Sequence, residues 1–199
     1  MGQLMRNPHS RLKIWLGKTW LKMNGWRLEG ELPSARQFVM IGAPHTTNWD
    51  LAYMLAISYV LGFKPFWLGK QSLFRGPMGP LMRWTGGVAI DRSQHANVVD
   101  QIVARFAESP DFILAVSPEG TRGTISRWKT GFYHMAVGAK VPIQLGFLDY
   151  KRKVGGLGHQ LIPSGDIVKD FEIIRAFYTP ISGLHPEQFD PAAIQATAG

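Results

Sequence analysis

Short apolar runs, each bounded by glycine, proline or charged residues, recur along most of the chain. Five of these runs have the length and the bounding residues that are typical of β-strands. They lie at residues 38–41, 66–68, 88–90, 112–116 and 141–148.

Helical patterns lie between these runs. Val98, Ile102 and Phe106 repeat every four residues, and a similar repeat covers residues 167–178. Residues 51–61 are apolar almost all round, which is typical of a helix in the core or against a membrane. Strands that alternate with helices predict an α/β fold, with a mostly parallel central sheet flanked by helices.

The first 28 residues have a different pattern, which predicts an N-terminal amphipathic helical segment. Residues 1–27 carry six basic side chains and no acidic one. Between these charges, apolar residues recur at helical spacing, at Leu12, Trp15, Leu16, Trp20 and Met23. Such a helix suits the headgroup layer of a membrane with anionic lipids. The alternative is a basic helix whose tryptophans pack on the domain.

The remaining residues, 29–199, are expected to form one domain, because no internal repeat or linker divides them. The stretch after Pro180 is rich in proline and alanine and predicts a loosely packed tail. The longest uncharged helical stretch, residues 51–63, is shorter than the roughly 20 apolar residues that span a bilayer. We therefore expect a peripheral protein on the cytoplasmic face of a membrane.

Composition narrows the possible chemistry. The 199 residues include no cysteine, which excludes disulfide scaffolds, zinc ribbons and thiol nucleophiles within them. The formal net charge of +8 favours polyanionic partners. A nucleic acid is not expected, because the aromatic residues gather in apolar runs and in the basic first segment rather than among basic residues on a sheet face.

A histidine and an aspartate follow the first predicted strand. His45 precedes Asp50 by five residues, between a strand and a helix, which is where open α/β sheets place ligands. A carboxylate that accepts a hydrogen bond from Nδ1 fixes the tautomer of the imidazole and leaves Nε2 free as a base. Alternatively, Asn48 and Asp50 cap the next helix.

The interval alone does not define a site, because the same interval separates two other pairs. They are His95 with Asp100 and His185 with Asp190. The first pair falls in a helix with a polar face and the second in the proline-rich tail, so we interpret both as incidental. None of the histidines has the spacing of metal ligands, and no metal is expected.

Basic residues and glycines follow later strands. Arg92 and Arg122 are placed to form a fork for a phosphate or carboxylate, with Lys70 as a third positive charge. The alternative is that Asp91 with Arg92 and Glu119 with Arg122 are local ion pairs at strand ends.

In their order and spacing, four blocks resemble the glycerolipid acyltransferase family, whose best-known members are the 1-acyl-glycerol-3-phosphate acyltransferases. The blocks are H-x4-D at His45 and Asp50, a G-x-I-D-R-like block at residues 86–92, E-G-T-R at residues 119–122, and V-P-I at residues 141–143. They cover roughly half the chain.

The resemblance implies that His45 is a general base oriented by Asp50. It places five residues at the acceptor headgroup, with help from Lys70: Arg92, Glu119, Gly120, Thr121 and Arg122. The implied reaction moves a fatty acyl group from acyl-CoA or acyl carrier protein to the hydroxyl of a lysophospholipid-type acceptor, with no cofactor.

Departures from the family pattern leave the acceptor open. They are Ser117 before Pro-Glu-Gly, Gln71 and Ser72 after Lys70, and residues 144–146 after V-P-I. The alternatives are O-acylation of a non-phosphate lysolipid, such as a lyso-aminolipid or a glycolipid, and a non-catalytic module that binds anionic lipid. Residues 151–156 and 163–166 are interpreted as basic and glycine-rich loops that contact substrate or carrier.

Overall fold

A computed structural model describes residues 9–90 and 95–196. Within these residues the strands form one seven-stranded sheet in the order β1-β7-β6-β2-β5-β3-β4. Neighbouring strands are parallel except for β6 and β7, which form an antiparallel hairpin. The strands are β1 Arg27–Glu29, β2 Gln37–Ala43, β3 Pro65–Lys70, β4 Gly87–Ile90, β5 Phe112–Val116, β6 Ile143–Asp149 and β7 Val154–Leu161.

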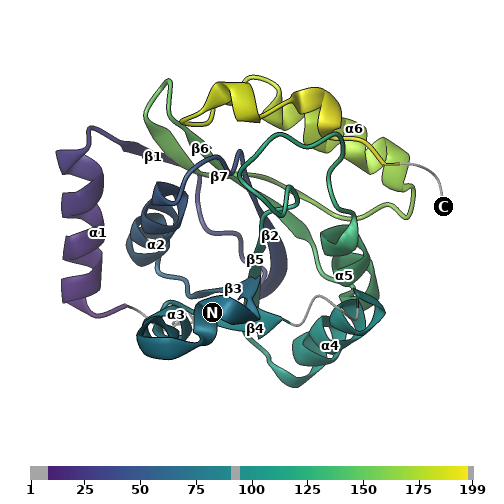
Figure 1. Cartoon of the computed structure of the whole chain (residues 1–199), viewed down its shortest axis with the longest axis horizontal. Coiled ribbons are helices and arrows are strands. Elements are labelled where there is room, and N and C mark those ends of the chain that lie inside the picture. Colours follow the sequence, from purple (N-terminus) through teal and green to yellow (C-terminus); the bar gives the residue numbers. More distant parts are fainter. Residues whose placement is uncertain (1–8, 91–94, 197–199) are drawn as a thin grey trace.

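Helices cover both faces of the sheet (Figure 1). Helix α2 lies on one face, with α1 outside it, and α4, α5 and α6 lie on the other. The α-helices are α1 Arg11–Met23, α2 Trp49–Leu61, α3 Gly79–Trp84, α4 His95–Glu108, α5 Gly131–Ala139 and α6 Ile167–Tyr178. Short 3₁₀ turns are η1 Gln71–Phe74, η2 Gly76–Met78, η3 Pro186–Gln188 and η4 Pro191–Ala193.

Strands β2 and β5 are apolar on both faces, because helices bury both sides of the sheet there. In β2, Phe38 and Met40 pack in the core on the α2 side, while Val39 and Ile41 belong to the larger core on the side of α4, α5 and α6. This double burial explains why the strands read as continuous apolar runs. The predicted fold class, an α/β fold with a mostly parallel sheet, is confirmed.

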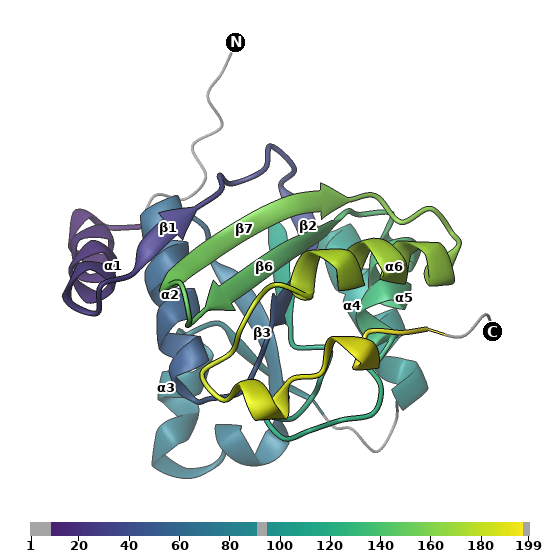
Figure 2. The same cartoon turned by 90° about the horizontal axis from the view of Figure 1, so that it is seen from above.

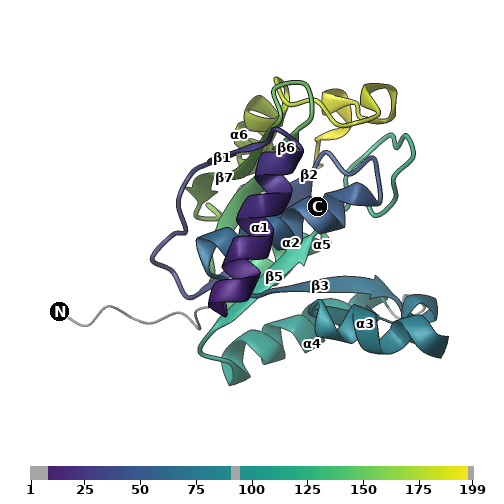
Figure 3. The same ribbon diagram turned by 90° about the vertical axis from the view of Figure 1, so that its left-hand side faces the viewer.

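Helix α1 confirms the predicted N-terminal helix and packs closely against α2 (Figure 3). The side chain of Ser10 accepts a hydrogen bond from the backbone of Lys13, which caps the helix at its start. Gly17 lies against α2, where an added Cβ would come within 2.7 Å of the carbonyl oxygen of Ala56. None of the helices in the described ranges is long and apolar enough to cross a membrane.

Two expectations were wrong. The glycine-rich residues 154–156, taken as a loop, begin strand β7. Gly155 and Gly156 pair there with β1, and a Cβ on Gly156 would meet the carbonyl oxygen of Glu29 at 1.8 Å. The pattern missed this strand because glycine and polar residues replace the β-branched and aromatic residues that mark most strands.

The stretch after Pro180 is also more ordered than a loosely packed tail. Ile181, Ala193 and Ile194 are buried in the main core. The backbone N–H of Trp128 donates to the carbonyl of Ala193 at 2.9 Å. Figure 2 shows that the segment after α6, drawn in yellow, folds back across the molecule.

Candidate active site

The loop that carries His45 lies at the carboxyl end of β2, just before α2. Strands β3, β4 and β5 are parallel to β2, so they end at the same edge of the sheet. The topology therefore brings the H-x4-D, G-x-I-D-R-like and E-G-T-R blocks toward one edge, as expected for ligand sites in α/β sheets. The V-P-I block, residues 141–143, leads into β6, which is parallel to β2, so it lies at the opposite edge, where the carbonyl of Pro142 accepts a hydrogen bond from the backbone N–H of Val39.

His45 and Asp50 form a hydrogen-bonded pair. The Nδ1 atom of His45 lies 3.0 Å from Oδ2 of Asp50, and the side chains are 32% and 8% exposed. The buried carboxylate thus accepts a hydrogen bond from the Nδ1–H group, which leaves Nε2 as the basic nitrogen of a partly exposed ring.

The carboxylate of Asp50 also holds the loop itself. Its Oδ2 accepts hydrogen bonds from the backbone N–H groups of Thr46 at 3.0 Å and Thr47 at 3.1 Å. Asn48, at the N-cap position of α2, makes no side-chain capping bond. The alternative that Asn48 and Asp50 cap the helix is therefore not found, because Asp50 binds His45 and two loop amides that precede α2.

The His185 pair is not organised in this way. The Nδ1 atom of His185 lies 3.6 Å from Glu187 on the surface, while Asp190 accepts a hydrogen bond from the backbone of Ala192. The side chain of His95 lies outside what the structure describes. The interval of five residues is therefore not sufficient to form the pair.

Glu119 binds the His45 loop from the end of β5. Its Oε2 accepts a hydrogen bond from the backbone N–H of His45 at 2.9 Å, and the residue is 6% exposed. Burial raises the pKa of Glu119 to about 7, although the hydrogen bond from His45 opposes the shift. The other oxygen, Oε1, is buried with no hydrogen-bond partner in the described residues. In that position a neutral, protonated carboxyl costs less free energy than a carboxylate.

The contact with His45 corrects one alternative. Glu119 faces inward to the His45 loop, so it does not form the local ion pair with Arg122. Arg122 is exposed, and its guanidinium donates instead to the side-chain oxygen of Asn48. The E-G-T-R loop therefore touches the His45 loop twice, once from inside and once on the surface.

The remaining predicted headgroup residues are placed as follows. Thr121 is exposed beside Arg122, and Gly120 has φ +67, a conformation that glycine adopts without strain. Lys70 ends β3 at the same edge of the sheet, but its side chain is outside the described structure. Arg92 also lies outside the described residues. The binding roles of these residues stay predictions.

Sequence reasoning missed two contacts of the His45 loop. The hydroxyl of Tyr150, after β6, donates to Oδ1 of Asp50 at 2.7 Å. The backbone N–H of His185 donates to Oγ1 of Thr46 at 3.3 Å, and Gly183 lies close beside it. Both contacts come from segments that no sequence pattern linked to this edge.

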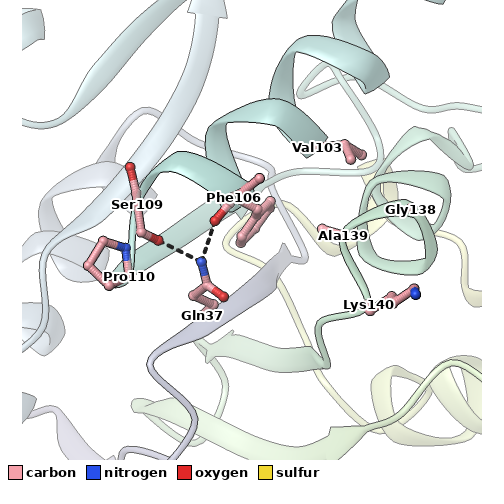
Figure 4. Close-up of a pocket in the computed structure, with 9 residues that line it drawn as sticks. Gln37, Val103, Phe106, Ser109, Pro110, Gly138, Ala139 and Lys140 are labelled. Carbon is pink, nitrogen blue, oxygen red and sulfur yellow. Dashed lines mark hydrogen bonds between the residues drawn. The ribbon is translucent and has the colours of Figure 1, made fainter.

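A pocket elsewhere in the fold does not belong to this site (Figure 4). It lies between α4 and α5, with Gln37 at its wall. The side-chain amide of Gln37 donates to the carbonyls of Phe106 and Ser109. Since Gln37 begins β2 and His45 follows its end, the two lie at opposite edges of the sheet.

A family model described as Acyltransferase matches residues 27–144, which is more than half of the chain. The chain belongs to this acyltransferase family, and the resemblance read from the sequence is confirmed. The matched region contains every predicted site residue, from His45 to Arg122.

Two individual proteins are similar to it. A 1-acyl-sn-glycerol-3-phosphate acyltransferase of Haemophilus influenzae is 30% identical over 140 residues, which cover 65% of this chain and 56% of that protein. The chain thus spans little more than half of that relative. The crystal structure of a 1-acyl-sn-glycerophosphate acyltransferase from Thermotoga maritima shares the fold, with a TM-score of 0.56 and 16% identity over 85% of this chain and 75% of that one.

Proposed function

We propose that this protein transfers a fatty acyl group from a thioester to the hydroxyl of 1-acyl-glycerol-3-phosphate, with His45 as the general base. One observation carries the proposal. The buried Asp50 holds Nδ1 of His45 at 3.0 Å while the imidazole remains partly exposed, in a loop that Arg122 also contacts through Asn48.

The pair supplies what acyl transfer to a hydroxyl requires. Nε2 of His45 takes the hydroxyl proton as the acceptor oxygen attacks the thioester carbonyl, and Asp50 stabilises the imidazolium. The carbon–sulfur bond then breaks, and the imidazolium returns the proton to the thiolate. A thiol of pKa about 8.5 leaves easily, so one base suffices without a covalent enzyme intermediate. Such a base is worth about 10²–10⁴-fold in rate.

Positive charge at the site supports a phosphate-bearing acceptor. Arg122 is exposed beside the loop of His45, where its planar guanidinium is able to bind phosphate oxygens in pairs. Lys70 and Arg92 are proposed to add further charge, and Thr121 a hydroxyl. The relative's name, 1-acyl-sn-glycerol-3-phosphate acyltransferase, supports the same acceptor.

The thioester donor is acyl-CoA or acyl carrier protein, and no cofactor is required. Both donors are anionic, which suits the net charge of +8. The alternative reaction is O-acylation of a non-phosphate lysolipid by the same His45 base. The panel of acceptors described below distinguishes the two reactions.

We further propose that the protein binds the surface of a membrane with anionic lipids, on its cytoplasmic face. Helix α1 packs on α2 through Gly17 and Leu21, and its other face is apolar and exposed. The exposed apolar side chains of α1 are Leu12, Trp15, Leu16 and Met23. Lysines and arginines beside them suit anionic headgroups.

The apolar surface continues beyond α1 to the segment η1–α3. There the exposed side chains are Leu73, Met78, Leu81 and Trp84. The Nζ atom of Lys13 lies 5.2 Å from the centre of the Trp84 ring, which joins the two parts. We name these eight residues the lipid-facing surface. An exposed apolar surface of this kind indicates an interaction site.

A panel of acceptors tests the proposed reaction. Purified protein is incubated with a labelled acyl thioester of coenzyme A or acyl carrier protein, and with lysophosphatidate, a lyso-aminolipid or a lysoglycolipid. Mass spectrometry then identifies the product. We expect label on lysophosphatidate. Label only on an acceptor without phosphate supports the alternative, and lipid binding without any transfer indicates a non-catalytic module.

A further inference from the structure

Tyr150 reaches the candidate active site from a part of the chain that none of the four blocks includes. It directly follows β6, in the turn to β7, and its hydroxyl donates to Oδ1 of Asp50 at 2.7 Å. Asp50 thereby has both carboxylate oxygens bound: Oδ2 by His45 and two loop amides, and Oδ1 by Tyr150.

We propose that Tyr150 is a positioning residue, which orients the carboxylate of Asp50 and through it the imidazole of His45. This inference rests on the proposed function, since it concerns the same base. Without the tyrosine hydroxyl, Oδ1 loses its donor and the carboxylate is held on one side alone. The imidazole would then be held less firmly in the orientation that points Nε2 at the acceptor.

The turn that presents Tyr150 is firmly built. Asp149, which is 1% exposed, accepts hydrogen bonds from the backbone N–H of Arg152 at 3.1 Å and from its Nε at 2.7 Å. The backbone N–H of Tyr150 donates to the carbonyl of Ser182 at 2.9 Å. The position of the hydroxyl is therefore fixed by backbone as well as by side-chain contacts.

Aromatic neighbours fix the ring itself. Tyr150 packs edge-on against Trp26, with the ring centres 4.9 Å apart, and against Tyr53, at 5.8 Å. Such a ring has little freedom to rotate away from Asp50. Burial, with the hydrogen bond to Asp50, raises the pKa of the Tyr150 hydroxyl well above its usual value. The hydroxyl therefore stays protonated near neutral pH and remains a hydrogen-bond donor to Asp50.

Tyr53 provides a matched control. It lies in the same aromatic cluster, 7% exposed, and stacks on Trp26 at 4.2 Å. Tyr53→Phe and Tyr150→Phe each remove one hydroxyl from this cluster, but only Tyr150 has its hydroxyl on Asp50. A general effect on packing appears in both variants, whereas a positioning effect appears in one.

The first readout is kinetic. We expect Tyr150→Phe to lower kcat by about 10-fold, the equivalent of one good hydrogen bond, with unchanged KM for donor and acceptor. Tyr53→Phe should retain the kcat of the wild-type protein. An unchanged kcat in Tyr150→Phe, or equal losses in the two variants, would overturn the inference.

The second readout does not depend on turnover. In protein labelled with ¹⁵N-histidine, the Nδ1 proton of His45 is assigned by its loss in His45→Gln. We expect Tyr150→Phe to shift this resonance and to speed its exchange with water, and Tyr53→Phe to leave it in place. If the wild-type protein transfers no acyl group but the resonance responds as described, the proposed function fails while the positioning of His45 stands. An unchanged resonance in Tyr150→Phe contradicts the positioning role, whatever the wild-type activity.

Discussion

The carboxylate of Glu119 accepts a hydrogen bond from the backbone N–H of His45 at 2.9 Å, across 74 positions of the chain. This hydrogen bond joins the H-x4-D block to the E-G-T-R block. Glu119 is buried, so it contacts the His45 loop from within, while Arg122 of the same block remains on the surface. The block thus combines an inner residue that binds the backbone of His45 with an exposed residue that binds the side chain of Asn48.

The buried Glu119 should make folding stability depend on pH. Its pKa is raised from 4.5 to about 7, so the folded protein keeps a proton that the unfolded chain releases. The stability that this proton contributes is fully present below about pH 4.5 and is lost as pH rises through about 7. We expect the Tm of the wild-type protein to fall between pH 5 and 8 relative to that of Glu119→Gln.

The variant Glu119→Gln is a suitable reference, because its amide oxygen still accepts the hydrogen bond from His45 and its NH₂ group resembles the protonated acid. Thermal unfolding at several pH values measures the difference between the two proteins. Parallel pH profiles would show that Glu119 does not titrate in this range.

Arg122 should act on acceptor binding. Arg122→Ala would remove the proposed charge-assisted hydrogen bonds to the acceptor phosphate, so we expect the acceptor KM to rise by about 10-fold or more while kcat changes little. Arg122→Lys keeps the charge but lacks the planar guanidinium. Its acceptor KM should therefore lie between those of the wild-type protein and Arg122→Ala. Steady-state kinetics with varied acceptor measure this. An equal loss with acceptors that have and lack phosphate would argue against a phosphate contact.

The lipid-facing surface should control membrane binding. Replacing Trp15 and Trp84 with serine removes two large exposed indoles. We expect a clear loss of the fraction that floats with anionic liposomes at low salt, with no loss of Tm, because neither ring is buried. Added salt should weaken binding by the wild-type protein.

Ile173→Ser is the control for this experiment. Ile173 is also an exposed apolar residue, 38% accessible, but it lies on α6, on the far face of the sheet from α1. It should leave flotation unchanged. Equal flotation of all three proteins, or full recovery of the wild-type protein in the soluble phase, would refute the assigned surface.

Gly17 should determine how α1 packs. Gly17→Leu places a side chain where even a Cβ lies 2.7 Å from the Ala56 carbonyl, so we expect a loss of about 1–3 kcal/mol in the free energy of unfolding. Gly131→Ala, at a helical glycine with open space around it, should be neutral or slightly stabilising. Denaturant unfolding tests both. A stable Gly17→Leu variant would mean that α1 is free to shift on α2.

The sequence predicted the parts of the fold that local pattern determines. Strands β2 and β5 have both faces buried, so their apolar runs are unmistakable, and Val98, Ile102 and Phe106 mark α4 by their spacing. Strand β7 escaped notice because its glycines are required by the close approach of β1, which no local pattern reports. The segment after α6 was misread because its proline and alanine content hid the core residues within it.

In the candidate site, too, local contacts could be predicted from the sequence and long-range contacts could not. His45 and Asp50 are five residues apart, so their contact was within reach of local reasoning. The inward turn of Glu119 and the contact of Tyr150 with Asp50 depend on how separate strands are arranged. A sequence shows that these residues exist, but their proximity is set by tertiary structure.

The most direct test of the central claim compares single-turnover acyl transfer by the wild-type protein and by His45→Ala, with His185→Ala as the control. Purified proteins are given lysophosphatidate and a labelled acyl thioester, and the labelled product is quantified. We expect His45→Ala to lose about 10²–10⁴-fold in rate, the worth of a positioned base, while His185→Ala retains the wild-type rate. Equal rates for His45→Ala and the wild-type protein would contradict His45 as the base.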